Sequence, residues 1–229
     1  MPAALIVAHG SPAEPGPQET ALQSLAAQVQ GQLPGWQVLG ATLAAPGALE
    51  TALDRLGPGA LIYPFFMAQG WFTGRELPRR LALAGAGALR QLDPFGTDPD
   101  LPGLMARVAL DGARQAGLDP AASTLLLAAH GSKVSRTSAD STYAMADHMR
   151  RLTSFTVTVG FVEEPPFLTD TARIDGPAIC LPFFALRAGH VAGDVPDALD
   201  QAGFSGPLLR AIGEHPMAAA LIAAALARA

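Results

Sequence analysis

The chain is nearly free of two reactive residue types. Among its 229 residues there is one lysine, Lys133, and one cysteine, Cys180. A single cysteine excludes a disulfide, a CxxC zinc site and an iron–sulfur cluster formed within one chain. Because Cys180 lies between isoleucine and leucine, we expect it on a buried strand. Charged residues make up only 15% of the sequence, which argues against a long disordered segment.

Positive charge is also scarce. Fifteen basic residues against twenty acidic ones give a net charge of −5, so a general binder of nucleic-acid backbones is not expected. A few local arginines could still hold a small anionic molecule. No apolar run approaches the roughly twenty residues of a membrane span, and the first residues lack the basic stretch of a secretory signal. These absences favour a soluble, cytoplasmic protein without a membrane or nucleic-acid partner.

Short apolar runs alternate along the chain with stretches of helical spacing. This alternation is typical of an α/β protein with parallel strands and crossover helices. The expected strands are residues 4–8, 38–43, 60–66, 125–129, 155–162 and 178–184. The expected helices are residues 19–33, 48–56, 74–83, 139–152 and 167–172. The second half of the chain therefore repeats the order of elements of the first half.

Four sequence landmarks also recur in the same order. AHGS begins at Ala8 and again at Ala129, and a proline precedes a helix at Pro46 and at Pro165 or Pro166. YPFF at 63–66 returns as LPFF at 181–184, and GTDP at 96–99 returns as GEHP at 213–216. The offsets of 121, 119 or 120, 118 and 117 residues are nearly constant. We therefore expect a tandem duplication of one Rossmann-like unit, with the boundary in the AGLDPAAS segment and domains spanning residues 1–118 and 119–229.

Each half places a histidine, His9 or His130, directly after its first strand. Ligands of parallel α/β sheets bind outside the carboxyl ends of the strands. An imidazole at that point can bind a metal ion or accept a proton near neutral pH. A single AHGS would fit equally well a structural histidine that bonds a loop carbonyl.

Only the second half adds companions to its histidine. The segment GFVEEPP supplies Glu163, opposite Leu43 of the first half, and the segment after LPFF supplies His190, opposite Phe72. Two imidazoles and a carboxylate from neighbouring strand ends form a plausible site for a borderline divalent ion. The first half offers only His9.

The ordered motifs AHGS, F-x-E and PFF, followed by His-x-x-x-Asp-Val-Pro, resemble the class II tetrapyrrole chelatases. The likeness is greatest to the CbiX, SirB and CbiK group of sirohydrochlorin cobaltochelatases and ferrochelatases, which are lyases. It implies two similar lobes with a cleft that receives a metal-free tetrapyrrole and Co²⁺ or Fe²⁺. The metal and catalytic residues of the family match His130, Glu163 and His190. The N-terminal site is degenerate by this comparison, as in the CbiK arrangement.

The resemblance also suggests roles for other side chains. His130 would be the main pyrrole base or metal ligand, His190 the second, and Glu163 would complete the metal site. Asp194 could orient His190, or it could equally be a carboxylate at a helix N-terminus. The residues expected to contact the anionic macrocycle are His9, Ser11, Trp71, Phe72, Ser132, Lys133, Arg136 and Arg187.

The same residues are compatible with more than one function. A non-catalytic carrier of metal or tetrapyrrole would need the same ligand residues as a chelatase. A hydrolase with Ser11 or Ser132 as nucleophile is disfavoured because the chain has no G-x-S-x-G elbow.

No permanently bound cofactor is expected, since the divalent ion is a substrate. A monomer would suffice, because the fused halves supply both walls of the cleft. Cobalt for cobalamin and iron for siroheme suit the same ligands.

Overall fold

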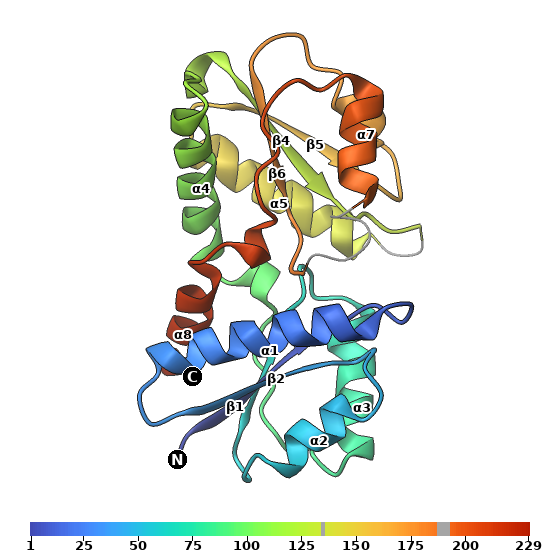
Figure 1. Ribbon diagram of the computed structural model, residues 1–229, viewed down its shortest axis with the longest axis vertical. Coiled ribbons are helices and arrows are strands. Elements are labelled where there is room, and N and C mark those ends of the chain that lie inside the picture. The colour runs from blue at the N-terminus through green and yellow to red at the C-terminus, as the bar shows by residue number, and fades with distance from the viewer. Residues whose placement is uncertain (134–135, 187–192) are drawn as a thin grey trace. The chain divides into compact units, whose positions relative to one another are not determined.

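The computed structural model describes residues 1–133, 136–186 and 193–229. It contains two sheets of three parallel strands each (Figure 1). The first has the order β2-β1-β3, and the second has the order β5-β4-β6. The strands are β1 (Ala3–Ala8), β2 (Gln37–Thr42), β3 (Leu61–Pro64), β4 (Thr124–Ala129), β5 (Thr156–Phe161) and β6 (Ala178–Pro182). The expected α/β class, its parallel strands and its duplication are confirmed.

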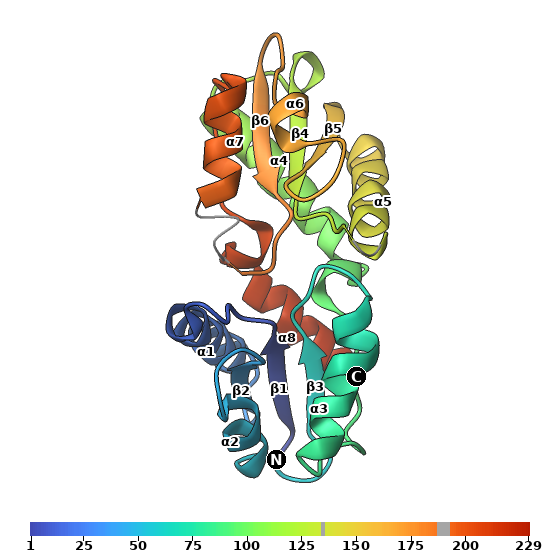
Figure 2. The ribbon, with the colours of Figure 1, turned by 90° about the vertical axis from the view of Figure 1, so that its right-hand side faces the viewer.

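The helices cover both faces of each sheet (Figure 2). On the first sheet, α2 (Ala48–Asp54) and α3 (Leu77–Leu83) pack on one face, and α1 (Pro15–Gln32) runs with α8 (Ala218–Arg228). On the second sheet, α6 (Leu168–Thr171) and α7 (Val195–Ala202) pack on one face, and α4 (Leu101–Gln115) runs with α5 (Thr137–Leu152). No helix in the described part of the chain combines the length and apolarity needed to cross a membrane.

Coverage of both faces explains why the strands read as unbroken apolar runs. Every residue of β1 and of β6 is buried. Cys180 lies on β6 with no exposed surface, as expected, and burial raises the pKa of its thiol. A thiol held in this state has little thiolate character, so it is a core residue and not a ligand or nucleophile.

The two compact units do not divide at residue 118. Unit 1 comprises residues 1–98 and 216–229, and unit 2 comprises residues 99–215. The expected boundary differs from this division because α4 buries its apolar side against α5 and β6, in the unit that follows it in sequence. The last helix, α8, returns to unit 1, where it packs on α1. An ion pair of 3.5 Å between Arg228 and the buried Asp98 ties α8 to that unit.

Backbone hydrogen bonds show that the repeated landmarks have the same structural task. The N–H of Phe65 donates to the Val7 carbonyl at 2.7 Å, and that of Phe183 donates to the Ala128 carbonyl at 2.7 Å. A glycine much later in each unit donates back to the last residue of the PFF motif. Gly96 donates to the Phe66 carbonyl at 2.9 Å, and Gly213 donates to the Phe184 carbonyl at 3.0 Å.

These two glycines are required by close backbone approach. A Cβ atom at Gly96 would overlap the carbonyl oxygen of Met67, and one at Gly213 would overlap the carbonyl oxygen of Ala185. Neither neighbour is a flexible side chain that could move aside. The glycine of GTDP and of GEHP is thus retained for packing.

We expect Gly96→Ala and Gly213→Ala each to lower the free energy of unfolding by about 1–3 kcal/mol, the usual cost of overpacking. Thermal unfolding followed by circular dichroism would measure the change. Gly103→Ala is the matched control, since no atom lies within 4 Å of its Cβ position in α4, and it should leave stability equal or slightly higher. Unchanged melting of both first variants would contradict this packing account.

Candidate functional site

In unit 2, His130 and Glu163 lie next to one another at the carboxyl ends of β4 and β5. The N–H of Glu163 donates to the carbonyl of His130 at 2.9 Å, and the N–H of Val162 donates to the carbonyl of Ala129 at 3.0 Å. Backbone hydrogen bonds therefore join the two segments past their last paired strand residues, Ala129 and Phe161. Because β4 is the central strand, His130 also lies beside the end of β6, where its ring is 6.5 Å from that of Phe184.

The His130 ring is held in one tautomer. Its Nδ1 lies 2.9 Å from the carbonyl oxygen of Gly131. A carbonyl can only accept a hydrogen bond, so Nδ1 carries the proton and donates it. With the proton on Nδ1, Nε2 is the ring nitrogen whose lone pair can bind a metal ion or accept a proton. His130 is half-buried, so this nitrogen is placed by its surroundings.

Glu163 carries its carboxylate beside the only lysine of the chain. Glu163 Oε2 lies 3.3 Å from Lys133 Nζ, and the two side chains are 31% and 73% exposed, respectively. Exposed pairs of this kind contribute little to stability. The lysine neutralises the carboxylate, but the interaction between them is weak. Glu163 therefore remains able to bind another cation.

The second glutamate of the VEEPP segment has a different partner. Glu164 Oε1 accepts a hydrogen bond of 2.8 Å from the backbone N–H of Ser132. Reasoning from the sequence took only Glu163 as a site residue. The adjacent carboxylate was visible in the sequence, but nothing there indicated that it would turn back onto the AHGS motif.

The other expected residues of this half lie around the same strand ends or outside the described part. Arg136 is exposed directly before α5, and Asp194 is the exposed N-cap residue of α7. His190 and Arg187 fall outside the described residues. In residues 1–133, 136–186 and 193–229, no three histidine, cysteine or acidic side chains come together to hold a metal ion. The three-ligand site with His190 therefore stays a prediction.

In unit 1 the counterpart of Glu163 is Ala44, because the Ala44 N–H donates to the His9 carbonyl at 2.9 Å. The sequence comparison, which set Leu43 opposite Glu163, was wrong by one residue. That comparison treated Gly40 and Gly160 as equivalent residues. Gly160 pairs with Ala128, whose equivalent in unit 1 is Val7, but Gly40 pairs with Ile6, one residue before Val7. The functional consequence is unchanged, since neither Leu43 nor Ala44 can bind a cation.

Aromatic side chains occupy the rest of this end of unit 1. The ring of Phe72 lies 4.2 Å from that of His9, 5.0 Å from that of Trp71 and 6.1 Å from that of Phe66. Trp71 is 59% exposed, and a π-helix over Phe72–Glu76 follows it. Ser11 is half-buried two residues after His9. The site in unit 1 is therefore aromatic where unit 2 offers carboxylates.

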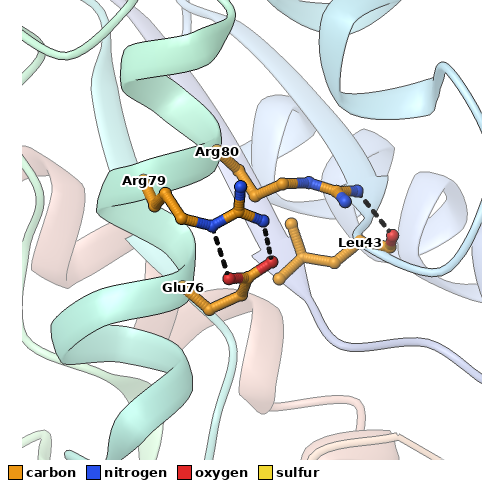
Figure 3. A network of polar contacts seen from close by, with 4 residues as sticks. All are labelled: Leu43, Glu76, Arg79 and Arg80. Carbon is orange, nitrogen blue, oxygen red and sulfur yellow. Dashed lines mark hydrogen bonds and ion pairs between the residues drawn. The ribbon is translucent and has the colours of Figure 1, made fainter.

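Arginines supply the charge near this end of unit 1 (Figure 3). Arg79 forms a forked pair with Glu76, with bonds of 2.9 and 2.8 Å, and Arg80 Nη2 donates to the Leu43 carbonyl at 2.8 Å. The hydrogen bonds from Arg79 hold the pKa of Glu76 below its ordinary value. The charge of Glu76 is therefore offset by that of Arg79, and Arg80 makes the net local charge positive.

Comparison with known proteins identifies relatives of the whole chain. The CbiX family model matches residues 124–229. A solved CbiX, described as the terminal enzyme for biosynthesis of siroheme in denitrifying bacteria, is 47% identical, with a TM-score of 0.91. The match covers 100% of this chain and 99% of that chain. A search of curated protein sequences found no significant match.

Two further solved structures share the fold. DR2241 from Deinococcus radiodurans, a multi-domain protein with structural similarity to chelatases, is 25% identical with a TM-score of 0.72. The match covers 99% of this chain and 54% of that chain. SirB from Bacillus subtilis, solved with Fe³⁺, is 14% identical with a TM-score of 0.76, over 98% of this chain and 94% of that chain.

The difference between the two units leads to a prediction about metal binding. We expect one equivalent of Co²⁺ to bind per chain in isothermal titration calorimetry. His130→Ala should weaken the affinity at least about tenfold, because it removes the Nε2 lone pair. His9→Ala is the matched control, since it alters the equivalent motif where Ala44 and Phe72 replace the companions, and it should leave the affinity unchanged. If His9→Ala alone abolished binding, the metal site would lie in unit 1 and the assignment to unit 2 would be wrong.

Proposed function

This chain belongs to the CbiX family, and from that premise we propose that it is a sirohydrochlorin chelatase. The substrates are a metal-free, anionic tetrapyrrole and a divalent ion, Co²⁺ or Fe²⁺. Among solved relatives, one is an enzyme of siroheme biosynthesis, and SirB has been solved with iron and with cobalt. Nitrogen and oxygen ligands accept either metal, so both remain candidates here.

The reaction exchanges two pyrrole N–H protons for one divalent cation. Three kinds of group are needed: a base that faces the macrocycle, ligands that replace the water around the ion, and a path for the protons. We assign the first task to Nε2 of His130, which is the basic nitrogen of its neutral ring. Glu163 and His190 complete the ligand set, and the Glu163 carboxylate can afterwards receive a proton.

The observation that supports this assignment best is the pairing of His130 with Glu163 through their backbones. The hydrogen bond of 2.9 Å from Glu163 to the His130 carbonyl fixes the two residues side by side. A base oriented by the Gly131 carbonyl therefore adjoins a carboxylate that pairs with a lysine at 3.3 Å. An arriving cation can displace that exposed ammonium at little cost.

Unit 1 would bind the macrocycle instead of the metal. The exposed Trp71 and the neighbouring rings of Phe72 and His9 form an aromatic cluster, and the indole face can stack on a conjugated ring system. As predicted from the sequence, Lys133, Arg136 and Arg187 would bind carboxylates of the macrocycle, with Ser11 and Ser132 as hydrogen-bonding partners. The N-terminal lobe, residues 1–118 in the sequence-based division, would thus keep the fold of its twin and lose its metal chemistry.

A carrier that binds metal or tetrapyrrole without joining them is the competing function. We expect multiple turnovers per chain when the purified protein is mixed with excess sirohydrochlorin and Co²⁺ or Fe²⁺, followed by the change in absorbance of the macrocycle. His130→Ala and His190→Ala should each lower kcat at least about 100-fold, as expected for loss of a base or ligand.

His9→Ala is the matched variant in the other unit, and it should keep substantial turnover. Stoichiometric binding without insertion would identify a carrier and reject the catalytic function. Loss of turnover in His9→Ala, with retention in His130→Ala, would reverse the assignment of the units.

A separate prediction concerns the aromatic surface. Trp71→Ala should raise the KM for the tetrapyrrole about tenfold, since stacking on an aromatic side chain is worth roughly 1–3 kcal/mol. The KM for the metal ion and kcat should change less than about twofold. Trp36→Ala is the control, because it removes the other tryptophan of the chain, which lies between α1 and β2. Equal effects of both changes would contradict a binding role for Trp71.

A further inference from the structure

The carboxylate of Glu164 is bonded to the same turn that carries His130. Its Oε1 accepts a hydrogen bond of 2.8 Å from the Ser132 N–H. Gly131, the middle residue of the turn, has a φ of +73°, and a Cβ there would lie 2.9 Å from Glu164 Cγ. Glycine is needed on both counts. The glutamate therefore packs directly on the His130–Gly131–Ser132 backbone and does not extend into solvent.

Backbone hydrogen bonds on either side hold Glu164 in this place. The Glu163 N–H donates to the His130 carbonyl at 2.9 Å, and the Phe161 N–H donates to the Pro166 carbonyl at 2.9 Å. The segment from 161 to 166 is thus closed on itself and attached to the end of β4. Its geometry leaves Glu164 facing the turn.

The two hydrogen bonds of the turn share one peptide group. The Ser132 N–H, which donates to Glu164, and the Gly131 carbonyl, which accepts from His130 Nδ1 at 2.9 Å, belong to the peptide that joins residues 131 and 132. A carboxylate on the N–H side polarises the peptide and makes its carbonyl a stronger acceptor. The chain of contacts runs from the Glu164 carboxylate, through the peptide, to the proton on Nδ1, and so to Nε2.

Unit 1 has the turn without the carboxylate. The register places Ala45 opposite Glu164, because Ala44 is the counterpart of Glu163. Gly10 keeps a φ of +78°, so the turn itself is conserved between the units. An alanine cannot accept a hydrogen bond through its side chain. The carboxylate is present only in the unit whose histidine has the metal-binding companions.

We propose that Glu164 is a positioning residue that orients His130 and fixes its Nδ1–H tautomer through the Gly131–Ser132 peptide. This arrangement resembles a histidine ligand held by a carboxylate, with a backbone peptide inserted between the two. The inference depends on the proposed chelatase function only for its effect on turnover. Its effects on the imidazole and on metal affinity can be measured without the tetrapyrrole.

The test compares Glu164→Ala and Glu164→Gln with the wild type. Calorimetry with Co²⁺ alone should show a 10- to 100-fold loss of affinity in Glu164→Ala, the range typical for groups that orient a ligand. Glu164→Gln keeps an acceptor oxygen for the Ser132 N–H and should lose less than about fivefold. Long-range ¹H–¹⁵N spectra of the His130 ring should show the Nδ1–H tautomer in the wild type and in Glu164→Gln, and a mixture in Glu164→Ala.

Glu50→Ala, at an exposed glutamate of α2, is the control and should match the wild type in every measurement. Wild-type Co²⁺ affinity and an unchanged His130 tautomer in Glu164→Ala would overturn the positioning role, even if the melting temperature fell. Equal losses in Glu164→Ala and Glu164→Gln would also overturn it, because they would show that an acceptor for the Ser132 N–H does not by itself hold the turn. A wild type that binds Co²⁺ but inserts no metal would reject the chelatase function alone.

Discussion

The site depends on one constraint, the backbone hydrogen bonds that join neighbouring segments just past the ends of the parallel strands. In a parallel sheet the carboxyl ends of all strands meet at one edge. Here a hydrogen bond beyond the last paired residues joins Glu163 to His130, so residues 33 positions apart in the sequence become neighbours through their backbones. The side chains need no further device to bring them together. The equivalent hydrogen bond in unit 1 joins Ala44 to His9, and the different outcome there is a matter of side-chain chemistry alone.

Duplication followed by divergence explains the rest of the molecule. The two units retain the glycines that avoid a backbone overlap, Gly96 and Gly213, and the left-handed glycines after each histidine. They differ where a ligand would be held. In unit 1, Phe72 packs on His9 and Arg79 is committed to Glu76. In unit 2, the corresponding edge carries two carboxylates with separate partners. Positions fixed by packing stayed the same, and positions free to face a ligand changed.

The sequence alone predicted the strands, the duplication and the location of His9, His130 and Glu163 just past strand ends. Short apolar runs in a buried parallel sheet are a strong signal, and repetition doubles it. It did not predict α4 (Leu101–Gln115), and the apolar stripe of that helix would not have shown which sheet it covers. It misplaced Leu43 because glycines at 40 and 160 were taken as equivalent, although each meets a different step of its neighbouring strand. It missed Glu164 because the direction of a loop side chain depends on long-range hydrogen bonds.

Two adjacent carboxylates at one site would ordinarily repel and would bind a cation together. The structure separates them by giving each a different partner. Lys133 lies 3.3 Å from Glu163, and the Ser132 N–H lies 2.8 Å from Glu164. A backbone N–H is fixed and cannot leave, whereas an ammonium that is 73% exposed can be displaced. Of the two glutamates, Glu163 is therefore the one better able to exchange its partner for an incoming ion. In the function proposed above, the neighbouring carboxylate would hold the turn that carries His130, so a single EE pair would serve both to bind and to position.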